Sequence, residues 1–557
     1  MASLDTCEPS IDAARRNGTS ATAEDMSAAG TALCDANDAT VTPDTSAAQR
    51  TITPDTSDEN DDNPLLDDVS DPDVDACLRV LDRITKDPAA FGTPQHRRLR
   101  GAVRAAHGAL TAGDFGGMDG LVHGRRRQLR KEREARATRR RDLDQKHRDS
   151  TQLRKQRIDK LKALENDQGP LLLAPDGAAK EGTSSLNAET TDSFRHCYTC
   201  KKRFDGLHEF YSQLCPSCAA LNWRMRSRTE DLSGRVALLT GARVKIGFET
   251  GLKLLRAGAY LIATTRFPHD LAARYGREAD ADEWRGRLEV HGLDLRDLRG
   301  VETFCAFIAE RHEALDVLVN NACQTVRRPA RYYSTLVEGE RRMSLTDGSG
   351  GENGIAVVSR NDASKALAVV APEDETVSFV QGKTDVNGQQ LDLREHNSWT
   401  ATLDEVATAE VVEAQAINCV APFILCSKLQ PLLAKAAQLR DRAFVVNVSA
   451  MEGKFYRYKT PNHPHTNMAK ASLNMLVRTC GADLAKRLHI YMTAVDTGWI
   501  NDENPAPKAY RTAQTGFQTP IDEVDAAARI LHPVFDGIVC ETPLSGVFLK
   551  DYGETEW

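Results

Sequence analysis

The feature that most constrains the fold is the segment 236–247, which reads Val-Ala-Leu-Leu-Thr-Gly-Ala-Arg-Val-Lys-Ile-Gly. Its first four residues are apolar and have the length of a short buried strand. Thr240 and Gly241 end that run, and apolar residues recur at helical spacing from Ile246 onward. A strand, a glycine turn and a helix form the beginning of a βαβ unit, where backbone N–H groups and the positive helix end can hold a pyrophosphate.

Further apolar runs follow along the chain, separated by helical patterns. A glycine turn by itself does not define a fold, so these later runs have to agree with it. Because short strands and helices alternate, we expect a series of βα units with parallel strands. The runs expected as strands are 259–263, 290–294, 315–322, 443–449 and 489–495.

Three chain segments carry the most specific motifs. They are the Thr240-Gly241 turn with Gly247, the strand end Asn320-Asn321-Ala322 and the strand end Asn447-Val448-Ser449. With these motifs, the chain from about Leu232 to Tyr552 resembles the short-chain dehydrogenase/reductase superfamily. The resemblance implies an α/β fold with a Rossmann-type doubly wound parallel sheet, and a nicotinamide cofactor.

The nucleotide site departs from the family pattern at one position. The family turn is usually Thr-Gly-x3-Gly-x-Gly, and here Lys245 takes the place of the middle glycine. Its side chain would crowd a backbone that approaches phosphate, although its ammonium could also reach a phosphate oxygen. After the second strand, Arg266 follows two threonines, with no acid to accept the ribose hydroxyls. Together with Arg243, this pattern favours the 2′-phosphate of NADP(H) over NAD(H).

The resemblance also implies which residues contact the cofactor. Thr497-Gly498 matches the family turn against which the nicotinamide carboxamide lies, and Asp294 matches the residue that contacts adenine. The full expected set is Gly241, Arg243, Lys245, Ile246, Gly247, Arg266, Asp294, Asn320, Ala322, Lys470, Thr497 and Gly498.

The catalytic pattern of the family is only half retained. Reductases of this family use serine, tyrosine and lysine with a supporting asparagine, and Lys470 and Asn418 match the last two. Thr466 stands where the tyrosine belongs, and the serine position falls on Ala450, one place after Ser449. A threonine hydroxyl has too high a pKa to replace a phenol as general acid near neutral pH.

The loop before Lys470 offers other proton donors. It contains Tyr456, Tyr458, His463 and His465, any of which could deliver a proton beside the lysine. The expected catalytic set is therefore Lys470, Asn418, Ser449, Thr466, His465 and Tyr458. The expected activity is NADP-dependent reduction of a carbonyl or oxidation of an alcohol in a small-molecule substrate. The alternative is a nucleotide-binding pseudoenzyme that acts as a sensor or scaffold.

Four cysteines upstream form a second chemical signal. Cys197 and Cys200 are separated by fourteen residues from the pair Cys215 and Cys218. Two such pairs can close a tetrahedron of thiolates around Zn²⁺, and a site with four protein ligands has a structural role. The alternatives are buried free cysteines or a disulfide. Since few residues separate this module from the first strand, we expect the two to pack together.

The remaining regions differ in composition. We expect an acidic disordered tail at 1–75, a basic helical arm at 76–165, a linker at 166–193, the zinc module at 194–228 and the dehydrogenase-like domain at 231–553, with an insertion at about 326–400. The apolar positions of the arm are too sparse for a heptad seam. The arm is therefore either a solvated charged helix or a binding element for nucleic acid or an acidic protein.

The insertion lies where substrates bind in this fold. Val357-Val358 and 377–380 could pair as a hairpin. Arg327, Arg328 and Arg394 could select an anionic substrate, or the whole segment could be a solvated surface insertion.

The sequence also bears on location and assembly. The first thirty residues lack the apolar run of a signal peptide, and the thirteen cysteines are an odd, scattered number. We read them as reduced thiols in the cytoplasm, with the nucleus as the alternative. No apolar stretch comes near the ~18–20 residues of a membrane helix, so we expect no membrane contact. Family members commonly pair through helices, which implies a homo-oligomer.

Overall fold

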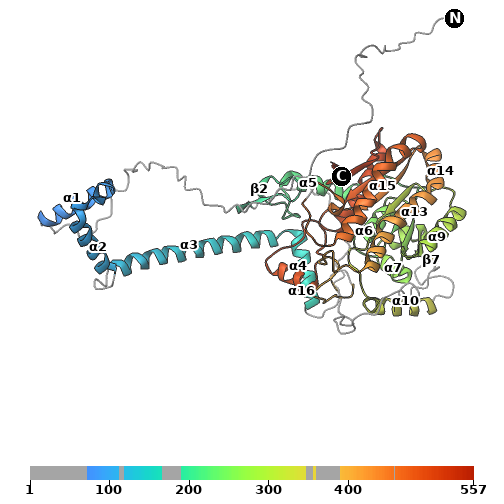
Figure 1. Cartoon of the computed structure of the whole chain (residues 1–557). Coiled ribbons are helices and arrows are strands. Elements are labelled where there is room, and N and C mark those ends of the chain that lie inside the picture. The colour runs from blue at the N-terminus through green and yellow to red at the C-terminus, as the bar shows by residue number, and fades with distance from the viewer. Residues whose placement is uncertain are drawn as a thin grey trace, which may run out of the picture. The chain divides into compact units, whose positions relative to one another are not determined.

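The computed structural model of this 557-residue chain describes residues 72–111, 118–165, 190–346, 355–358, 385, 389–456 and 458–557. The chain divides into two compact units, residues 1–116 and 117–557 (Figure 1). The tail expected at 1–75 and the linker expected at 166–193 lie almost wholly outside the described residues, as does most of the insertion, including 377–380.

In the first unit, the helical pattern found from Val74 onward forms two helices. They are α1 (Pro72–Lys86) and α2 (Arg97–Thr111), joined through the short 3₁₀ turns η1 (Ala90–Gly92) and η2 (Pro94–His96). The apolar face of α1 is open among the described residues, because Leu78 is 57% exposed and Leu81 is 45% exposed.

The second unit is built on a nine-stranded sheet. Its strands are β3 (Val236–Thr240), β4 (Tyr260–Thr265), β5 (Leu288–Gly292), β6 (Val317–Asn320), β7 (Ala356–Val358), β8 (Ala443–Ser449), β9 (Ile490–Asp496), β10 (Val547–Lys550) and β11 (Gly553–Thr555). Their order is β11-β10-β9-β8-β6-β3-β4-β5-β7, and every neighbouring pair is parallel except β10 and β11. The strand order reverses at β3, which confirms the doubly wound α/β sheet expected from the sequence.

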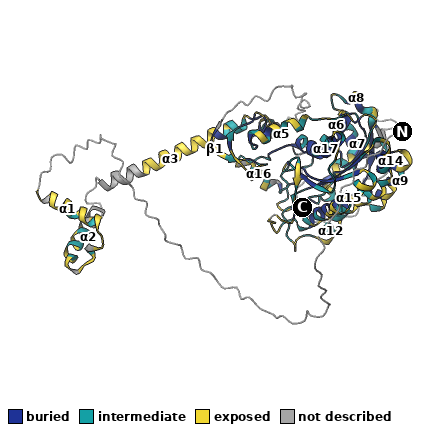
Figure 2. Cartoon of the chain, turned by 90° about the horizontal axis from the view of Figure 1, so that it is seen from above, coloured by how far each residue is buried: buried dark blue, intermediate teal, exposed yellow. Residues whose placement is uncertain are grey.

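Helices cover both faces of this sheet (Figure 2). On one face lie α6 (Lys245–Arg256), α7 (Pro268–Tyr275), α8 (Ala281–Trp284) and α17 (Glu523–Val539); on the other lie α9 (Leu298–Arg311), α13 (Ala421–Lys428), α14 (Gln430–Arg440) and α15 (Pro464–Leu488). Successive residues of β3 alternate between the two cores, since Leu238 packs on the second face and Leu239 on the first. A strand buried on both faces is therefore apolar throughout, as the sequence of β3 is.

One helix changes an expectation about membranes. The continuous helix Thr408–Lys428 comprises α12 (Thr408–Gln415), the π-turn η5 (Ala416–Val420) and α13, and its length and mean hydropathy of 1.4 would suffice to cross a membrane. The sequence-based statement that no stretch comes near this length is wrong for this helix. Here α12 packs against α15 and α13 against α9, so the helix is part of the domain core.

The insertion extends the sheet, while the second half of the expected hairpin, 377–380, lies outside the described residues. Val357 and Val358 lie in β7, which pairs in parallel with β5 at the edge of the main sheet. The insertion also contributes η4 (Ala330–Tyr333) and α10 (Ser334–Thr346), and α10 packs on α7. An edge strand needs only one partner, so this short apolar run could add to the existing sheet without a second strand.

The four-cysteine module, residues 190–227, packs on the sheet domain as expected. It consists of β1 (Thr190–His196), β2 (Arg203–Gly206) and α5 (Pro216–Ser227). Its core includes Phe210, Tyr211 and Leu214 together with Ile521 and Ala526 of the sheet domain. The two therefore share one hydrophobic cluster.

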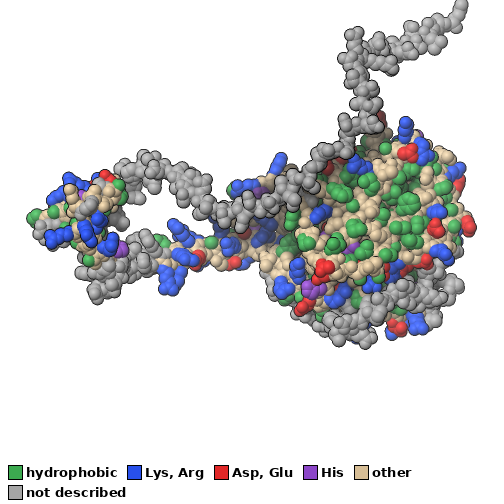
Figure 3. Space-filling model, in the orientation of Figure 1, with side chains coloured by type: hydrophobic (Ala, Val, Ile, Leu, Met, Phe, Trp, Pro, Cys, Tyr) green, Lys and Arg blue, Asp and Glu red, His purple; other side chains and the backbone are tan. Residues whose placement is uncertain are grey.

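The basic arm has two parts with different surroundings. In α3 (Met118–Asp149), residues 127–143 are exposed, and Lys and Arg side chains follow one another along the helix (Figure 3). In α4 (Gln152–Glu165), Leu153 is buried in the cluster of the four-cysteine module. Only the first part is thus a solvated charged helix.

Candidate nucleotide-binding site

The turn after β3 is closed tightly around its two glycines. Gly241 has φ +70°, and a Cβ there would lie 2.9 Å from Ala322 Cα. A Cβ at Gly247 would lie 2.1 Å from the carbonyl oxygen of Gly241. Side chains are sterically excluded at both positions, so only glycine fits this turn at the carboxyl edge of the sheet.

Hydrogen bonds fix this turn to the end of β6. Thr240 Oγ1 accepts from the backbone N–H groups of Asn321 and Ala322 at 3.0 Å each. Asn321 Nδ2 donates in return to the carbonyl oxygen of Thr240 at 3.0 Å. Two motifs that lie about 80 residues apart in the sequence are thus one structural unit.

Lys245 retains the backbone shape of the glycine it replaces. It is the first residue of α6 and has φ +54°, in the left-handed region that glycine favours. Its Nζ lies 3.9 Å from Glu503 Oε1, in the segment after β9. The ammonium therefore lies beside a carboxylate across the edge of the sheet, and the turn itself is not opened by the substitution.

A cluster of arginines lies beyond the end of β4. Arg266 donates to Tyr333 Oη at 3.0 Å, and its guanidinium lies 4.6 Å from the centre of that ring. Arg243 and Arg274 share one carboxylate, Asp270, at 2.8 and 2.7 Å. Burial, and then the nearby Arg274 and Arg266, hold the pKa of Arg243 below its ordinary value, although Asp270 raises it. These three cations thus exceed the one carboxylate that Arg243 and Arg274 share.

The contact of Tyr333 with Arg266 was not predicted from the sequence, because Tyr333 belongs to the insertion. The adjacent pair Tyr332-Tyr333 was a usable signal, since two neighbouring aromatic side chains in a loop must find cover. Asp294, expected to contact adenine, forms an ion pair with Arg296 at 2.6 Å. Burial raises the pKa of Asp294, but this arginine outweighs burial and lowers it.

Lys470 and Asn418, the two residues that match the family's catalytic pattern, are buried near the carboxyl ends of the strands. Lys470 Nζ donates to the carbonyl oxygen of Val448 at 2.8 Å. Asn418 lies in the π-turn η5, where its Oδ1 accepts from Gln324 N at 2.8 Å and its Nδ2 donates to Gln324 O at 3.0 Å. Single π-turns inside α-helices are frequent at functional sites, because they reorient a helix around one residue.

Thr466, at the tyrosine position, and Ser449, beside the serine position, both carry buried hydroxyl groups. Thr466 is 1% exposed, and its hydroxyl has no hydrogen-bond partner among the described atoms. Ser449 donates to Asn474 Oδ1 at 2.6 Å and is 2% exposed. Neither hydroxyl replaces the acidity of a phenol.

The residues expected to replace the missing tyrosine as proton donor differ in exposure and in their neighbours. Tyr458 is 92% exposed. His465 is 2% exposed and its Nε2 lies 3.6 Å from Glu410 of α12, while burial lowers its pKa. His463 is different: its Nδ1 lies 2.8 Å from the carbonyl oxygen of Trp399, and the two rings stack at 4.0 Å with an angle of 6°. A carbonyl only accepts, so Nδ1 carries the proton and Nε2 is left as the exchangeable nitrogen.

The last part of the insertion, residues 397–399, joins the segments that surround these residues. Asn397 Nδ2 donates to the carbonyl oxygen of Glu503 at 3.0 Å. Ser398 Oγ accepts from the backbone N–H of Arg327 at 2.8 Å. With the contact between Trp399 and His463, this short segment touches the loops after β6 and β9 and the start of α15.

The arginines of the insertion are not available as expected. Arg327 lies 3.1 Å from Glu413, and Arg328 and Arg394 both pair with Asp392. Since a carboxylate faces each guanidinium, these contacts give no support to the hypothesis of an anion-selecting lid.

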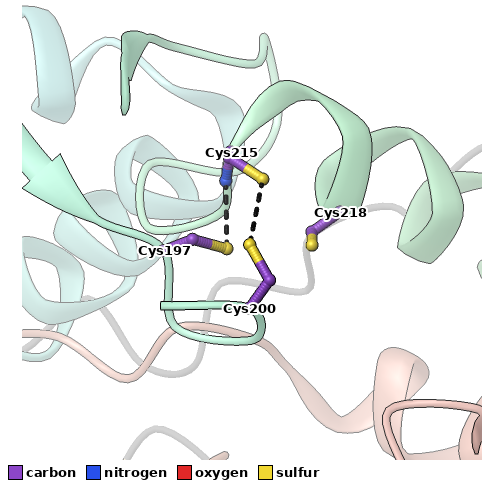
Figure 4. A group of neighbouring side chains, drawn as sticks. All are labelled: Cys197, Cys200, Cys215 and Cys218. Atoms are coloured by element: carbon purple, nitrogen blue, oxygen red, sulfur yellow. Dashed lines mark hydrogen bonds between the residues drawn. The ribbon is translucent and has the colours of Figure 1, made fainter. Parts of the chain in front are cut away.

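The four cysteines converge as their spacing predicted (Figure 4). Their Sγ atoms all lie within 4.8 Å of one another. Cys200 and Cys215 are 3.6 Å apart, too far for a disulfide and close to the separation of about 3.8 Å that two thiolates have on one Zn²⁺. Cys215 is the N-cap of α5, where a helix favours a thiolate. Burial raises the pKa of Cys215, but hydrogen bonds from Ser217 and its neighbours lower it to about 6.

Comparisons with known proteins point to one family. A family model described as short chain dehydrogenase matches residues 235–338. An uncharacterized protein of Acanthamoeba polyphaga mimivirus is 32% identical over 355 residues, which cover 62% of this chain and 72% of that protein. The matched 62% of 557 residues is longer than the segment 231–557, so the similarity extends upstream towards the four-cysteine module.

Other similarities are more limited. The WW domain-containing oxidoreductase of Gallus gallus is 37% identical over 98 residues, 16% of this chain and only 22% of that protein. The solved Pseudomonas aeruginosa RhlG/NADP active-site complex has 19% identity and a TM-score of 0.37, over 57% of this chain and 95% of that one. On the family model and the sequence relatives, this chain belongs to the short-chain dehydrogenase/reductase superfamily, a family of oxidoreductases.

Proposed function

We propose that this chain is an NADP(H)-dependent oxidoreductase that transfers hydride between the nicotinamide and a carbonyl or alcohol substrate. The observation that carries the proposal is the turn at Gly241 and Gly247, where both side chains are sterically excluded and α6 begins directly behind the backbone N–H groups. A helix N-terminus reached through such a turn is suited to a diphosphate. Lys245 would exchange Glu503 for a phosphate oxygen when the nucleotide binds.

The preference for NADP(H) is supported by the arginines beyond β4. Arg266 lies on the ring of Tyr333, and Arg243 and Arg274 bring further positive charge to one carboxylate. A 2′-phosphate carries the negative charge that such a cluster attracts, whereas the free hydroxyls of NAD(H) would call for an acid at this strand end.

The proton would be handled by His463 in place of the missing tyrosine. His463 is the N-cap residue of α15, the helix that carries Thr466 and Lys470 in its first two turns. Its ring is held by Trp399, and Nε2 is the nitrogen that can exchange a proton. Lys470 would hold the ribose, as the family lysine does.

A nucleotide titration tests the binding part of this proposal. We expect the fluorescence of NADPH to change on binding, with NADPH bound at least about tenfold more tightly than NADH. Arg266→Ala should remove most of that preference, whereas Arg277→Ala, at a nearby exposed position, should retain it. A chain that ignores both nucleotides would show the proposal to be wrong.

Turnover tests the catalytic part. With a panel of aldehydes and ketones, His463→Gln should lower the rate of NADPH oxidation about 100-fold and leave NADPH affinity unchanged, because only the proton step is affected. His489→Gln changes a histidine whose side chain is 59% exposed and should have no effect. Full activity in His463→Gln would exclude this residue as the donor.

A second function, NADP(H) sensing without turnover, is favoured by one observation. With Thr466 and Ala450 at these positions, the chain lacks both the acidic phenol and the serine hydroxyl that the family uses at the reacting carbonyl. If wild-type protein binds NADPH tightly, and none of the carbonyl compounds tested is reduced by it in single-turnover experiments, this function is the correct one. In that case Lys470→Ala would weaken nucleotide binding and leave the other measured properties of the protein unchanged.

We also propose that the four cysteines hold one structural Zn²⁺. The convergence of four thiols within 4.8 Å supports a closed tetrahedral site, which has no position open to substrate. Elemental analysis should find about one zinc per chain, and Cys197→Ser should lose it. A metal-free protein that is fully folded would contradict the assignment.

A further inference from the structure

The four-cysteine module contacts the sheet domain at the segment that directly follows β9. Tyr198 lies between Cys197 and Cys200, and its hydroxyl oxygen accepts a hydrogen bond from the backbone N–H of Trp499 at 2.8 Å. The same oxygen would lie 3.2 Å from a Cβ at Gly498. A residue of the first cysteine pair thus holds the backbone of this segment directly.

A buried arginine provides a second connection. Arg529 of α17 is 2% exposed and donates to the carbonyl oxygen of Thr497 at 2.8 Å. Its other terminal nitrogen donates to Asn222 Oδ1 of α5 at 3.0 Å, and Asp551 pairs with its charge at 2.7 Å. Because a buried guanidinium must keep its partners, α5 and Thr497 are tied to each other through it.

Apolar packing connects the same two regions. Ile500 is 5% exposed and lies in one cluster with Cys197 and Cys215, two of the four thiols. Thr519 Oγ1 donates to the carbonyl oxygen of Ile500 at 2.7 Å. A close-packed cluster transmits displacement, so a shift of either cysteine would move Ile500.

The segment held in this way runs on into the proposed nucleotide site. Thr497 and Gly498 are the residues expected against the nicotinamide, and Glu503 lies beside Lys245 of the diphosphate turn. Within this stretch, Trp499 and Ile500 contact the four-cysteine module, and Glu503 contacts Asn397 at the end of the insertion. The metal site and the nicotinamide side of the nucleotide site therefore share one stretch of backbone.

We propose that zinc in the four-cysteine module positions residues 497–503, so that zinc binding and NADP(H) binding are thermodynamically coupled, and that Tyr198 is the main positioning residue. This inference rests on the proposed nucleotide and zinc sites. The coupling is reciprocal: zinc raises the affinity for NADP(H), and NADP(H) raises the affinity for zinc by the same factor. The adenosine side of the nucleotide would lie at the end of β4, which none of the contacts named above joins to the module among the described residues.

The variant Tyr198→Phe tests the positioning role, since it removes one hydroxyl and leaves the thiols intact. We expect zinc content to stay at about one per chain and NADPH affinity to fall about tenfold, because Trp499 N–H loses its partner. The affinity for 2′,5′-ADP, which lacks the nicotinamide half, should change less than about twofold. Tyr510→Phe, at a tyrosine that is 59% exposed, should leave all three quantities unchanged.

The outcomes separate this inference from the proposed function. Wild-type protein that binds neither NADPH nor 2′,5′-ADP would overturn both. If wild-type protein binds both ligands and Tyr198→Phe either keeps its NADPH affinity or loses the two affinities equally, the inference alone is wrong.

Competition with a chelator tests the reciprocal effect without any variant. Zinc is partitioned between the protein and 4-(2-pyridylazo)resorcinol at equilibrium, with and without saturating NADPH. We expect NADPH to raise the apparent zinc affinity several-fold and 2′,5′-ADP to leave it unchanged. An equal effect of the two ligands, or no effect of NADPH, would show that the sites are not coupled in this way.

Discussion

At the scale of single residues, the diphosphate turn shows how backbone geometry selects amino acids. Gly241 and Gly247 occupy positions where a Cβ would meet Ala322 and the Gly241 carbonyl. Lys245 stands at a third position, where the left-handed backbone with φ +54° favours glycine. In this turn, the steric exclusion of a side chain acts at Gly241 and Gly247, whereas the preference of a left-handed backbone for glycine can be tested by itself at Lys245.

Gly247→Ala should destabilise the second unit. The added methyl carbon would lie 2.1 Å from a backbone carbonyl oxygen, which cannot move aside as a flexible side chain can. We expect a loss of about 1–3 kcal/mol and weaker NADPH binding. Urea unfolding should show no comparable loss for Gly286→Ala, because no atom lies within 4 Å of a Cβ at that position. Equal stability of the two variants would contradict the tight turn.

Substitutions of Lys245 separate backbone strain from phosphate binding. Lys245→Gly relieves the left-handed strain and should raise stability by about 1 kcal/mol relative to Lys245→Met. Both variants remove the ammonium group. If this group binds phosphate, both should lower the affinity for NADPH about tenfold. Stability is read by urea unfolding and affinity by fluorescence titration. Unchanged NADPH affinity in both variants would show that the lysine pairs only with Glu503.

At the scale of helices and strands, the four-cysteine module is joined to α6 and α17 by polar contacts that cross the interface. Arg226 of α5 pairs with Asp522 at 2.5 Å, at the N-terminus of α17. The backbone carbonyl of the same arginine accepts from Lys253 Nζ of α6 at 2.9 Å. These contacts fix the orientation of α5, and one of them has a consequence for the pH dependence of stability.

Burial lowers the pKa of Lys253 to about 8, with Arg226 and Arg256 adding to the effect. Between that value and its unfolded pKa of about 10.4, the unfolded chain binds more protons than the folded one. The contribution of Lys253 to stability therefore rises with pH across this window, by up to about 3 kcal/mol. Unfolding free energies measured at pH 7.5 and pH 10 should show a larger gain for wild type than for Lys253→Met. A constant difference between the two proteins would contradict the lowered pKa.

At the scale of the whole chain, residues 117–557 form one unit that includes half of the expected basic arm. Arg154 donates to the carbonyl oxygen of Gly516 at 2.9 Å, and Arg157 donates to that of Ile521 at 2.7 Å. With Leu153 buried beside them, α4 belongs structurally to the four-cysteine module. The part of the chain that stabilises the second unit therefore begins before α4 and includes this helix.

Two truncations test that boundary. Removal of residues 1–116 should leave the melting temperature of the second unit unchanged within about 1 °C, because the two units are compact separately. Removal of residues 1–165 exposes the cluster around Leu153 and should lower it by roughly 5–10 °C. Differential scanning fluorimetry compares both with the full chain. Equal melting temperatures would show that α4 contributes nothing to the fold.

Six of the nine strands of the sheet, the glycine turn after β3 and the cysteine cluster could be predicted from the sequence. These depend on local rules: strands buried on both faces are apolar throughout, a left-handed or crowded backbone selects glycine, and two CxxC pairs can close a tetrahedron. Lys470 and Asn418 were found because they match a family pattern, and the structure buries both at the edge where the strands end.

Which side chains become neighbours could be seen only in the folded chain. The stacking of His463 on Trp399, the contact of Tyr198 with Trp499 and the cover of Arg266 by Tyr333 each join residues more than sixty positions apart. The addition of β7 to the sheet edge and the pairing of Arg328 with Asp392 were likewise invisible in the sequence. Such contacts depend on how the insertion and the module pack on the sheet, and packing is decided by the shape of the whole surface rather than by spacing along the chain.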